Sequence, residues 1–165
     1  MPYKRTIDRA RRDRRAGKSA STQASEFIRE EIDKIRHGKH GARSPQQAIA
    51  IGLSEARRAG VELSPPQKGK KSTRKSARYA YDVGQGKRKT HRRPRVSRAV
   101  LQVLRRARRS SASYRSLSQH AKGAASRRSA SARSASARKA ARTKGASGRA
   151  KAAKKAARTR ARHGR

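Results

Sequence analysis

The chain has 165 residues, of which 49 are Lys or Arg and 9 are Asp or Glu, so its formal net charge at pH 7 is +40. Hydrophobic residues make up 32% and aromatic residues 3%, with no Trp and one Phe, which is too little apolar bulk to bury a large core. There is no Cys, which excludes disulfides and thiolate metal sites, and no stretch approaches the ~20 apolar residues of a membrane span.

Charge and composition together predict the broad class of the protein. Such an excess of positive charge favours binding to a polyanion, with nucleic acid as the first expectation and an anionic membrane surface as the second. The N-terminus lacks the apolar segment of a secretory signal, so we expect a soluble intracellular protein. We predict a mostly α-helical chain with extensive disorder, built from a small helical hairpin, a third basic helix and a long disordered basic tail.

Residues 1–18 read as a basic N-terminal arm, and residues 19–63 read as the folded part. The second segment has seven Lys or Arg and six acids, so it is almost neutral. Its first helix is predicted to begin at Ser21 or Thr22, both good N-caps, and to end at Gly38. Its apolar residues recur at helical spacing: Ala24, Phe27, Ile28, Ile32 and Ile35.

The second helix of the hairpin has a stronger start signal. Ser44 is followed by Pro45 and then by Gln47, a capping box with proline at the first helical position. The helix is predicted to end at Gly60, and we expect one side of it to pack against the first helix. The residues expected on that side are Ile49, Leu53, Ala56 and Val61.

Two features of the hairpin leave alternatives open. Ile51 lies on the far side of the second helix, so it either meets a third helix or a second copy of the hairpin, or it is partly exposed. A homo-oligomer through the hairpin would suit a unit this small. The acids Glu26, Glu30 and Asp33 share a polar side of the first helix, which is either solvated or docks the basic arms of the chain.

The segment "KHGARSPQQAIAIGLSEARRAG", residues 39–60, also carries a resemblance. Residues 17–61 are similar to a family of small basic bacterial proteins that share a domain of unknown function. A later segment, "SYRSLSQHAKGAASRR", resembles a looser shared element of such proteins. Members are sometimes labelled DNA-binding or plasmid-stabilisation proteins. The resemblance implies a bacterial cytoplasmic protein and is silent on mechanism.

Residues 64–94 have the Pro, Gly, Lys and Arg content of a linker. Tyr79 and Tyr81 are either base-stacking residues, as in single-strand binding segments, or ordinary linker residues.

Residues 95–120 contain a predicted basic amphipathic helix, "RVSRAVLQVLRRARR", whose apolar side is followed from Val96 to Ala107. Such a helix binds nucleic acid, a membrane surface or a partner groove, and the absence of Trp and Phe argues against membrane burial. We expect it either to cover Ile51 with its arginines turned outward or to become ordered only on binding. Its predicted nucleic-acid-binding residues are Arg98, Arg105, Arg106, Arg108 and Arg109.

Residues 121–165 are a low-complexity tail of 16 Ala and 16 Lys or Arg among 45 residues, without an acid or an apolar residue larger than Ala. The tail resembles the C-terminal tails of linker histones and is predicted to be disordered alone and partly helical on DNA. A flexible arm of this kind neutralises phosphates and does not read base sequence. Its predicted nucleic-acid-binding residues are Arg138, Lys139, Arg142, Lys144, Arg149, Lys151, Lys154, Lys155, Arg158, Arg160 and Arg162.

Catalysis, metals and cofactors are not expected. His37 and His40 have a metal-like spacing but no acid or Cys beside them in the sequence, and the lone Gly84-Gln85-Gly86 is not a nucleotide fingerprint. The sequence therefore predicts a non-enzymatic protein that binds DNA without sequence specificity and compacts or bridges it in the bacterial nucleoid. The alternatives are an RNA- or ribosome-associated protein, and a protein-interaction module in which the hairpin binds the partner and the tail localises it.

Overall fold

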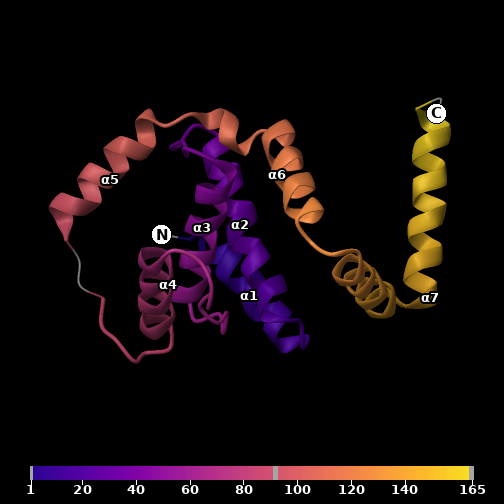
Figure 1. The fold of residues 1–165 in the computed structure, drawn as a ribbon, viewed down its shortest axis with the longest axis horizontal. Coiled ribbons are helices and arrows are strands. Elements are labelled where there is room, and N and C mark those ends of the chain that lie inside the picture. Colours follow the sequence, from indigo (N-terminus) through magenta and orange to yellow (C-terminus); the bar gives the residue numbers. More distant parts are fainter. Residues whose placement is uncertain (1, 91–92, 164–165) are drawn as a thin grey trace. The chain divides into compact units, whose positions relative to one another are not determined.

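A computed structural model describes residues 2–90 and 93–163 (Figure 1). Residue 1 of the predicted arm, residues 91–92 of the predicted linker and residues 164–165 of the predicted tail lie outside this description. Within the described ranges there are helices and no strands, which confirms the mostly α-helical prediction. The helices are α1 (Lys4–Arg15), α2 (Ala20–Arg36), α3 (Pro45–Arg58), α4 (Lys71–Gly84), α5 (Pro94–Arg106), the 3-10 helix η1 (Arg109–Ala112), α6 (Tyr114–Ser126) and α7 (Ala130–Arg162).

The two helices expected in the almost neutral segment are α2 and α3, and they pack against each other. Ser44 caps α3 as expected, because its hydroxyl accepts a hydrogen bond from Gln47 N at 3.2 Å. The Gln47 side chain reaches back one residue farther than in a capping box, since its Oε1 accepts from Arg43 N at 2.7 Å. Helix α2 begins slightly earlier than predicted, because Ser19 rather than Ser21 or Thr22 is its N-cap.

The inner side of α3 differs from the prediction. Ala48, Gly52 and Ala56 are buried, whereas Ile49 and Leu53 are only half-buried. A Cβ atom on Gly52 would lie 2.7 Å from the Cα atom of Ile28 in α2. The two helices therefore approach through small residues, which bring their backbones closer than large side chains would allow.

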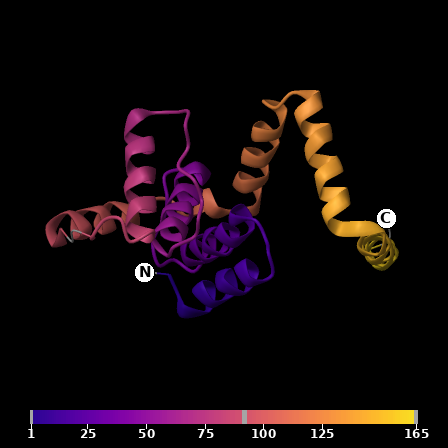
Figure 2. The same ribbon diagram turned by 90° about the horizontal axis from the view of Figure 1, so that it is seen from below.

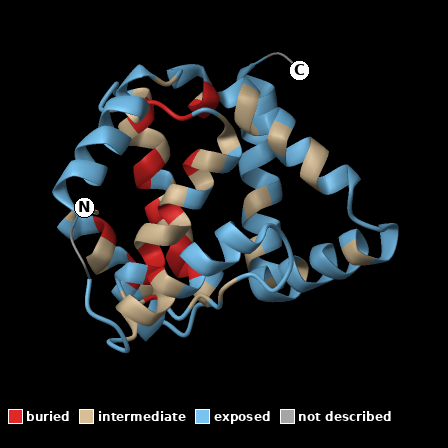
Figure 3. Ribbon diagram, turned by 60° about the vertical axis from the view of Figure 1, so that its left-hand side comes forward, coloured by how far each residue is buried: buried red, intermediate tan, exposed pale blue. Residues whose placement is uncertain are grey.

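Two small clusters of buried side chains make the core of residues 1–120 (Figure 3). One consists of Ala10, Ala24, Phe27, Ala56 and Val61, and the other consists of Ile35, Ala42, Ala48 and Ala112. Of the packing residues predicted from the sequence, Phe27 and Ile35 are fully buried, and the half-buried ones are Ile28, Ile32, Ile49, Ile51 and Leu53.

The predicted N-terminal arm is instead the helix α1, which packs on α2 (Figure 2). Thr6 and Ala10, one helical turn apart, are buried there. The backbone N–H of Tyr3 donates to both carboxylate oxygens of Glu30 at 3.0 Å, and Arg9 lies 3.6 Å from Glu26. The acids on α2 thus hold the N-terminal segment in place, which corresponds to the docking alternative for that strip.

Part of the predicted linker is also helical. Helix α4 buries Ala77 and Ala80 and packs on α3. A Cβ atom on Gly84 would lie 1.7 Å from the carbonyl oxygen of Arg57, so the end of α4 directly touches the end of α3. Only a residue without a side chain fits at that point.

Helix α5 occupies the predicted third-helix position and extends away from the other helices of residues 1–120 (Figure 1). It has no buried residue, and Val96, Val100 and Val103 are 54%, 52% and 68% exposed. It therefore does not pack its apolar side on the hairpin, and Ile51 is half-buried without that cover.

Residues 121–165 form a second compact unit, which contains the end of α6 and all of α7. Where the composition predicts a disordered tail, the structure has a helix that is interrupted at Gly145, whose φ is +66°. No residue of α7 is buried, so the helix is maintained by local backbone hydrogen bonds and by the high helix propensity of Ala, Arg and Lys.

Candidate nucleic-acid interface

The basic residues predicted to bind nucleic acid are all exposed. Arg98, Arg105 and Arg106 lie on α5, and Arg108 and Arg109 follow at the start of η1. The eleven predicted residues of the tail all lie on α7 and point outward around a helix that has no apolar side. Within its own unit, each group presents cations to solvent.

The arginines after α5 are held against the loop that joins α2 to α3. Gly41 N donates to the carbonyl of Leu104 at 2.8 Å, and Ala42 N donates to that of Arg108 at 3.2 Å. A Cβ atom on Gly41 would lie 1.9 Å from the carbonyl oxygen of Ala107, so glycine is required for this contact. The "KHGARS" motif therefore contains the docking loop for residues 104–108.

A second contact fixes η1 to α2. Ala112 is fully buried, and its carbonyl accepts a hydrogen bond from Arg36 Nε at 2.9 Å. The same guanidinium lies 4.0 Å from the centre of the Tyr114 ring. The start of "SYRSLSQHAKGAASRR" is thus anchored to the hairpin, and the two segments that carry the family resemblance meet there.

The acids of the chain lie before residue 83 and face cations within residues 1–120. Six of them form ion pairs with Lys or Arg, and a seventh, Glu31, lies beside His40. The ion pairs are Asp13 with Lys18, Glu26 with Arg9 and Arg29, Glu30 and Glu55 with Lys34, Glu62 with Arg14, and Asp82 with Arg78. Residues 83–165 contain 28 Lys or Arg and no acid. The positive charge of that stretch therefore has no carboxylate within it to neutralise it.

Glu31 is the most deeply buried acid, at 1% exposure. Its Oε1 atom lies 3.5 Å from His40 Nε2 and has no hydrogen-bond partner among the described residues. Burial raises the pKa of the Glu31 carboxyl; His40 opposes this shift, and nearby Glu55 adds to it.

The pKa of Glu30, one residue earlier, shifts in the opposite direction. Burial acts to raise its pKa, but hydrogen bonds from Lys34, Thr6 and the backbone of Tyr3 outweigh burial and lower the pKa. Lys34 lies between Glu30 at 2.6 Å and Glu55 at 3.5 Å. Burial acts to lower the pKa of Lys34, but these carboxylates outweigh burial and raise the pKa.

The arginines of α1 were not among the residues predicted to bind nucleic acid. Arg5, Arg9 and Arg12 recur at helical spacing, and together with Arg11, Arg15 and a single acid they line a hollow of about 440 Å³. The signal for this helix was the Thr6 and Ala10 pair, too small to stand out as an apolar stripe.

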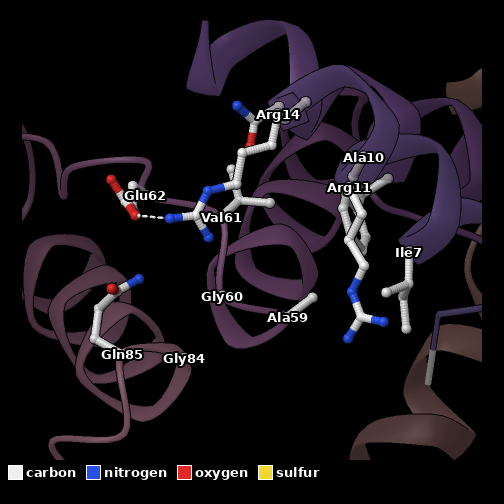
Figure 4. Close-up of a pocket in the computed structure, with 12 residues that line it drawn as sticks. Ile7, Ala10, Arg11, Arg14, Ala59, Gly60, Val61, Glu62, Gly84 and Gln85 are labelled. Carbon is white, nitrogen blue, oxygen red and sulfur yellow. Dashed lines mark hydrogen bonds and ion pairs between the residues drawn. The ribbon is translucent and has the colours of Figure 1, made fainter. Parts of the chain in front are cut away.

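Figure 4 shows a neighbouring pocket of about 340 Å³ between α1 and the ends of α3 and α4. Arg14 reaches across it to Glu62 at 2.5 Å, and Arg11 lies farther along the same helix. The exposed pair thus joins α1 to the segment that follows α3.

The cations on the exposed side of α4 were also not predicted as a nucleic-acid-binding surface. Lys71, Arg74, Lys75 and Arg78 follow one another at helical spacing along a groove of about 830 Å³ that also contains Tyr81. Tyr79 belongs to an adjoining hollow, where the Arg88 guanidinium lies 5.1 Å from its ring centre. Both tyrosines are therefore carried by a helix, not by an extended linker.

His37 and His40, which have a metal-like spacing in the sequence, have different contacts. His37 Nδ1 is 2.7 Å from the carbonyl oxygen of Asp33, and His40 faces Glu31. In the part of the chain that the structure describes, no three His, Cys, Asp or Glu residues are grouped so as to hold a metal ion. Nor is any helix in the described ranges both long and apolar enough to cross a membrane.

Comparison with known proteins places one segment of the chain. Residues 11–69 match DUF6496, a family of unknown function. This segment runs from α1 through α2 and α3 and ends before α4, so it contains the hairpin and the docking loop. No curated protein and no solved structure matches the chain.

Proposed function

We propose that this protein binds DNA without sequence specificity and compacts or bridges it as a histone-like component of the bacterial nucleoid. The observation that carries the proposal is the separation of charge along the chain. Six acids are paired with Lys or Arg within residues 1–82, whereas residues 83–165 contain 28 Lys or Arg and no acid. A polyanion is the ligand that neutralises such a stretch.

The proposed affinity comes from phosphate contacts. Each Lys or Arg that neutralises a phosphate releases counterions, so the logarithm of the binding constant falls with that of the salt concentration by about 0.9 per contact. The exposed cations of α7 are distributed around the helix and do not form one rigid reading surface. In this proposal phosphate neutralisation relieves the mutual repulsion of the cations along α7 and so stabilises the helix.

The test is a titration of duplex DNA with the full-length protein at several salt concentrations, beside two charge variants. One variant has Gln at the eleven tail positions named above, and the other has Gln at Arg98, Arg105, Arg106, Arg108 and Arg109. We expect the tail variant to bind more weakly and with a shallower salt slope than wild type. The proposal would be refuted if both variants bound duplex DNA with the affinity and the salt slope of wild type.

The exposed apolar side of α5 favours a second candidate function, self-association that bridges two DNA molecules. Val96, Val100 and Val103 are more than half exposed and share one side of this helix. If α5 pairs with a second copy, V100D should abolish concentration-dependent dimerisation in sedimentation equilibrium and leave duplex affinity per chain unchanged. A wild-type protein that stays monomeric at all concentrations would remove this candidate.

A further inference from the structure

We propose that the groove along α4 binds unpaired nucleotides of a single-stranded nucleic acid, with Tyr81 as the stacking surface. This inference rests on the proposed function in that the ligand is a nucleic acid. It adds a second, structurally defined site, separate from the arginines of α5 and from the tail.

The groove has two different walls. One wall is the exposed side of α4, which carries Lys71, Arg74, Lys75 and Arg78 above Tyr81, and the other is the segment of residues 64–67 with Pro65 and Pro66. Its volume of about 830 Å³ lies within the ~300–1,000 Å³ of typical small-molecule sites, so it accommodates a nucleotide.

Both walls are fixed to α3. On α4, Ala77 and Ala80 are buried on the side opposite the groove, which directs the cations outward. On the other wall, the buried side chain of Arg57 donates to the carbonyl of Leu63 at 3.0 Å and to that of Ser64 at 3.4 Å. Arg57 is therefore a positioning residue that holds the chain at the entrance to the groove.

The charge of the groove suits phosphate. Five Lys or Arg line it, including Lys87 beyond the helix, against one acid, Asp82. That acid is already engaged, because Arg78 Nε lies 3.3 Å from Asp82 Oδ1. A nucleic-acid backbone along α4 thus meets a row of cations and no unpaired carboxylate.

The half-buried tyrosine selects unpaired bases. In a duplex the bases are paired and stacked on one another, so a duplex presents only its backbone to α4, whereas a single strand also presents base faces. The ring of Tyr79 is already covered by Arg88, which leaves Tyr81, beside Pro65 and Pro66, as the aromatic surface of the larger groove. Aromatic rings among cations are the usual means of holding single strands without sequence preference.

The experiment uses the full-length protein and three labelled probes: oligothymidylate, oligouridylate and a duplex with the same number of phosphates. Fluorescence anisotropy gives the affinity for each probe. We expect Y81L to weaken binding of both single strands about tenfold and to leave duplex binding unchanged, while Y81F retains single-strand binding. The probe that wild type binds more tightly distinguishes DNA from RNA as the strand, and the loss of affinity in Y81L tests the groove for either strand.

Tyrosine emission supplies a second readout, because the chain has no Trp and only four Tyr. Single strands should quench the emission of wild type, and the quenching should shrink in Y81F although the affinity is kept. Y114F is the matched control, since Tyr114 is 80% exposed and lies outside the groove, and phenylalanine keeps the ring that faces the Arg36 guanidinium. The double variant R74Q/K75Q should also weaken single-strand binding, which covers the case in which Y81L does not fold.

Two results overturn the inference. One is unchanged single-strand affinity in both Y81L and R74Q/K75Q, and the other is an equal loss for duplex and single strand in Y81L. Neither result would contradict the proposed function. That function is contradicted if wild type does not bind the duplex probe at all.

Discussion

Three glycines determine how closely distant parts of residues 1–120 approach one another. Gly52 lies against the backbone of Ile28, Gly41 against the carbonyl of Ala107, and Gly84 against the carbonyl of Arg57. In each case the nearest atoms belong to backbone, which cannot rotate out of the way as a side chain can. The residue type therefore sets the geometry of the contact.

Gly52→Ala tests this at the contact between α2 and α3. Alanine raises helix propensity by about 1 kcal/mol, but its Cβ would lie 2.7 Å from Ile28 Cα and 3.1 Å from the Phe27 carbonyl oxygen. Overpacking of this kind costs about 1–3 kcal/mol, so we expect a net loss of stability. Urea unfolding followed by circular dichroism measures it.

The matched control is Gly123→Ala in α6, where the nearest atom to the new Cβ would be the end of the Arg127 side chain at 4.0 Å. That variant should be as stable as wild type or slightly more stable. If Gly52→Ala gains stability like the control, the close approach of α2 and α3 is not as described.

The adjacent acids Glu30 and Glu31 predict opposite pH dependences. The pKa of Glu31 is raised in the folded chain, so ionising it costs stability as the pH rises above its ordinary value of 4.5. Glu31→Gln should therefore stabilise the protein at neutral pH by about 1 kcal/mol, because the cost of ionising a buried carboxyl is removed. The gain should vanish below pH 4.5, where Glu31 is protonated in both folded and unfolded chains.

Glu30→Gln is the paired variant. The pKa of Glu30 is lowered in the folded chain. Its contribution to stability is therefore present above pH 4.5 and is lost as the pH falls through its pKa in the folded chain. This substitution should destabilise the protein at neutral pH by about 1–3 kcal/mol and have little effect in acid. Thermal melts of both variants between neutral and acidic pH should diverge in opposite directions; parallel curves would contradict the assignment.

At the level of elements, the sequence predicted helices wherever large apolar residues or strong caps recur. Helix α2 has its Phe and Ile stripe, α3 has Ser44 and Pro45, and α5 has its valines. Helices α1 and α4 escaped prediction because each is held by two small buried residues, Thr6 with Ala10 and Ala77 with Ala80. Such pairs do not stand out from an Ala-rich basic background.

The candidate site was also predicted only in part. The exposure of the cations of α5 and α7 can be predicted from composition alone, because so many adjacent charged side chains cannot be buried. The α4 groove depends on Pro65, Pro66 and Tyr81 being brought beside one helical side, and that requires the fold of α3 and α4. No periodicity in the sequence connects those positions.

The anchor of η1 on α2 provides the test at this scale. Arg36→Gln removes the guanidinium that binds the Ala112 carbonyl and lies over Tyr114, at a cost of about 1–2 kcal/mol. We expect residues 104–114 to detach more often, so that trypsin cleaves at Arg105 and Arg106 about tenfold faster.

Arg29→Gln on the same helix is the control, because Arg29 is 63% exposed and pairs only with Glu26 among the contacts described. Its cleavage rate should equal that of wild type. Equal rates for both variants and wild type would mean that Arg36 does not hold the anchor.

Over the whole molecule, the acids and the packing residues are confined to one part of the chain. The acids and all the large apolar side chains lie in residues 1–120, whereas residues 121–165 carry 16 Lys or Arg and nothing that builds a core. An arm of this composition acts by the number of its charges, since its cations surround α7 and are not gathered on one side of the helix for reading bases. Its order of residues should therefore matter little for affinity.

Shuffling residues 121–165 while keeping their composition tests that consequence. In the full-length protein, we expect the shuffled tail to leave duplex affinity and the salt slope unchanged. Replacing eight of its Lys or Arg by Gln at scattered positions should instead flatten the slope by up to ~7, because each lost phosphate contact removes about 0.9. If the shuffled protein binds markedly more weakly than wild type at the same salt, the order of residues in α7 carries information, and recognition is more specific than charge neutralisation.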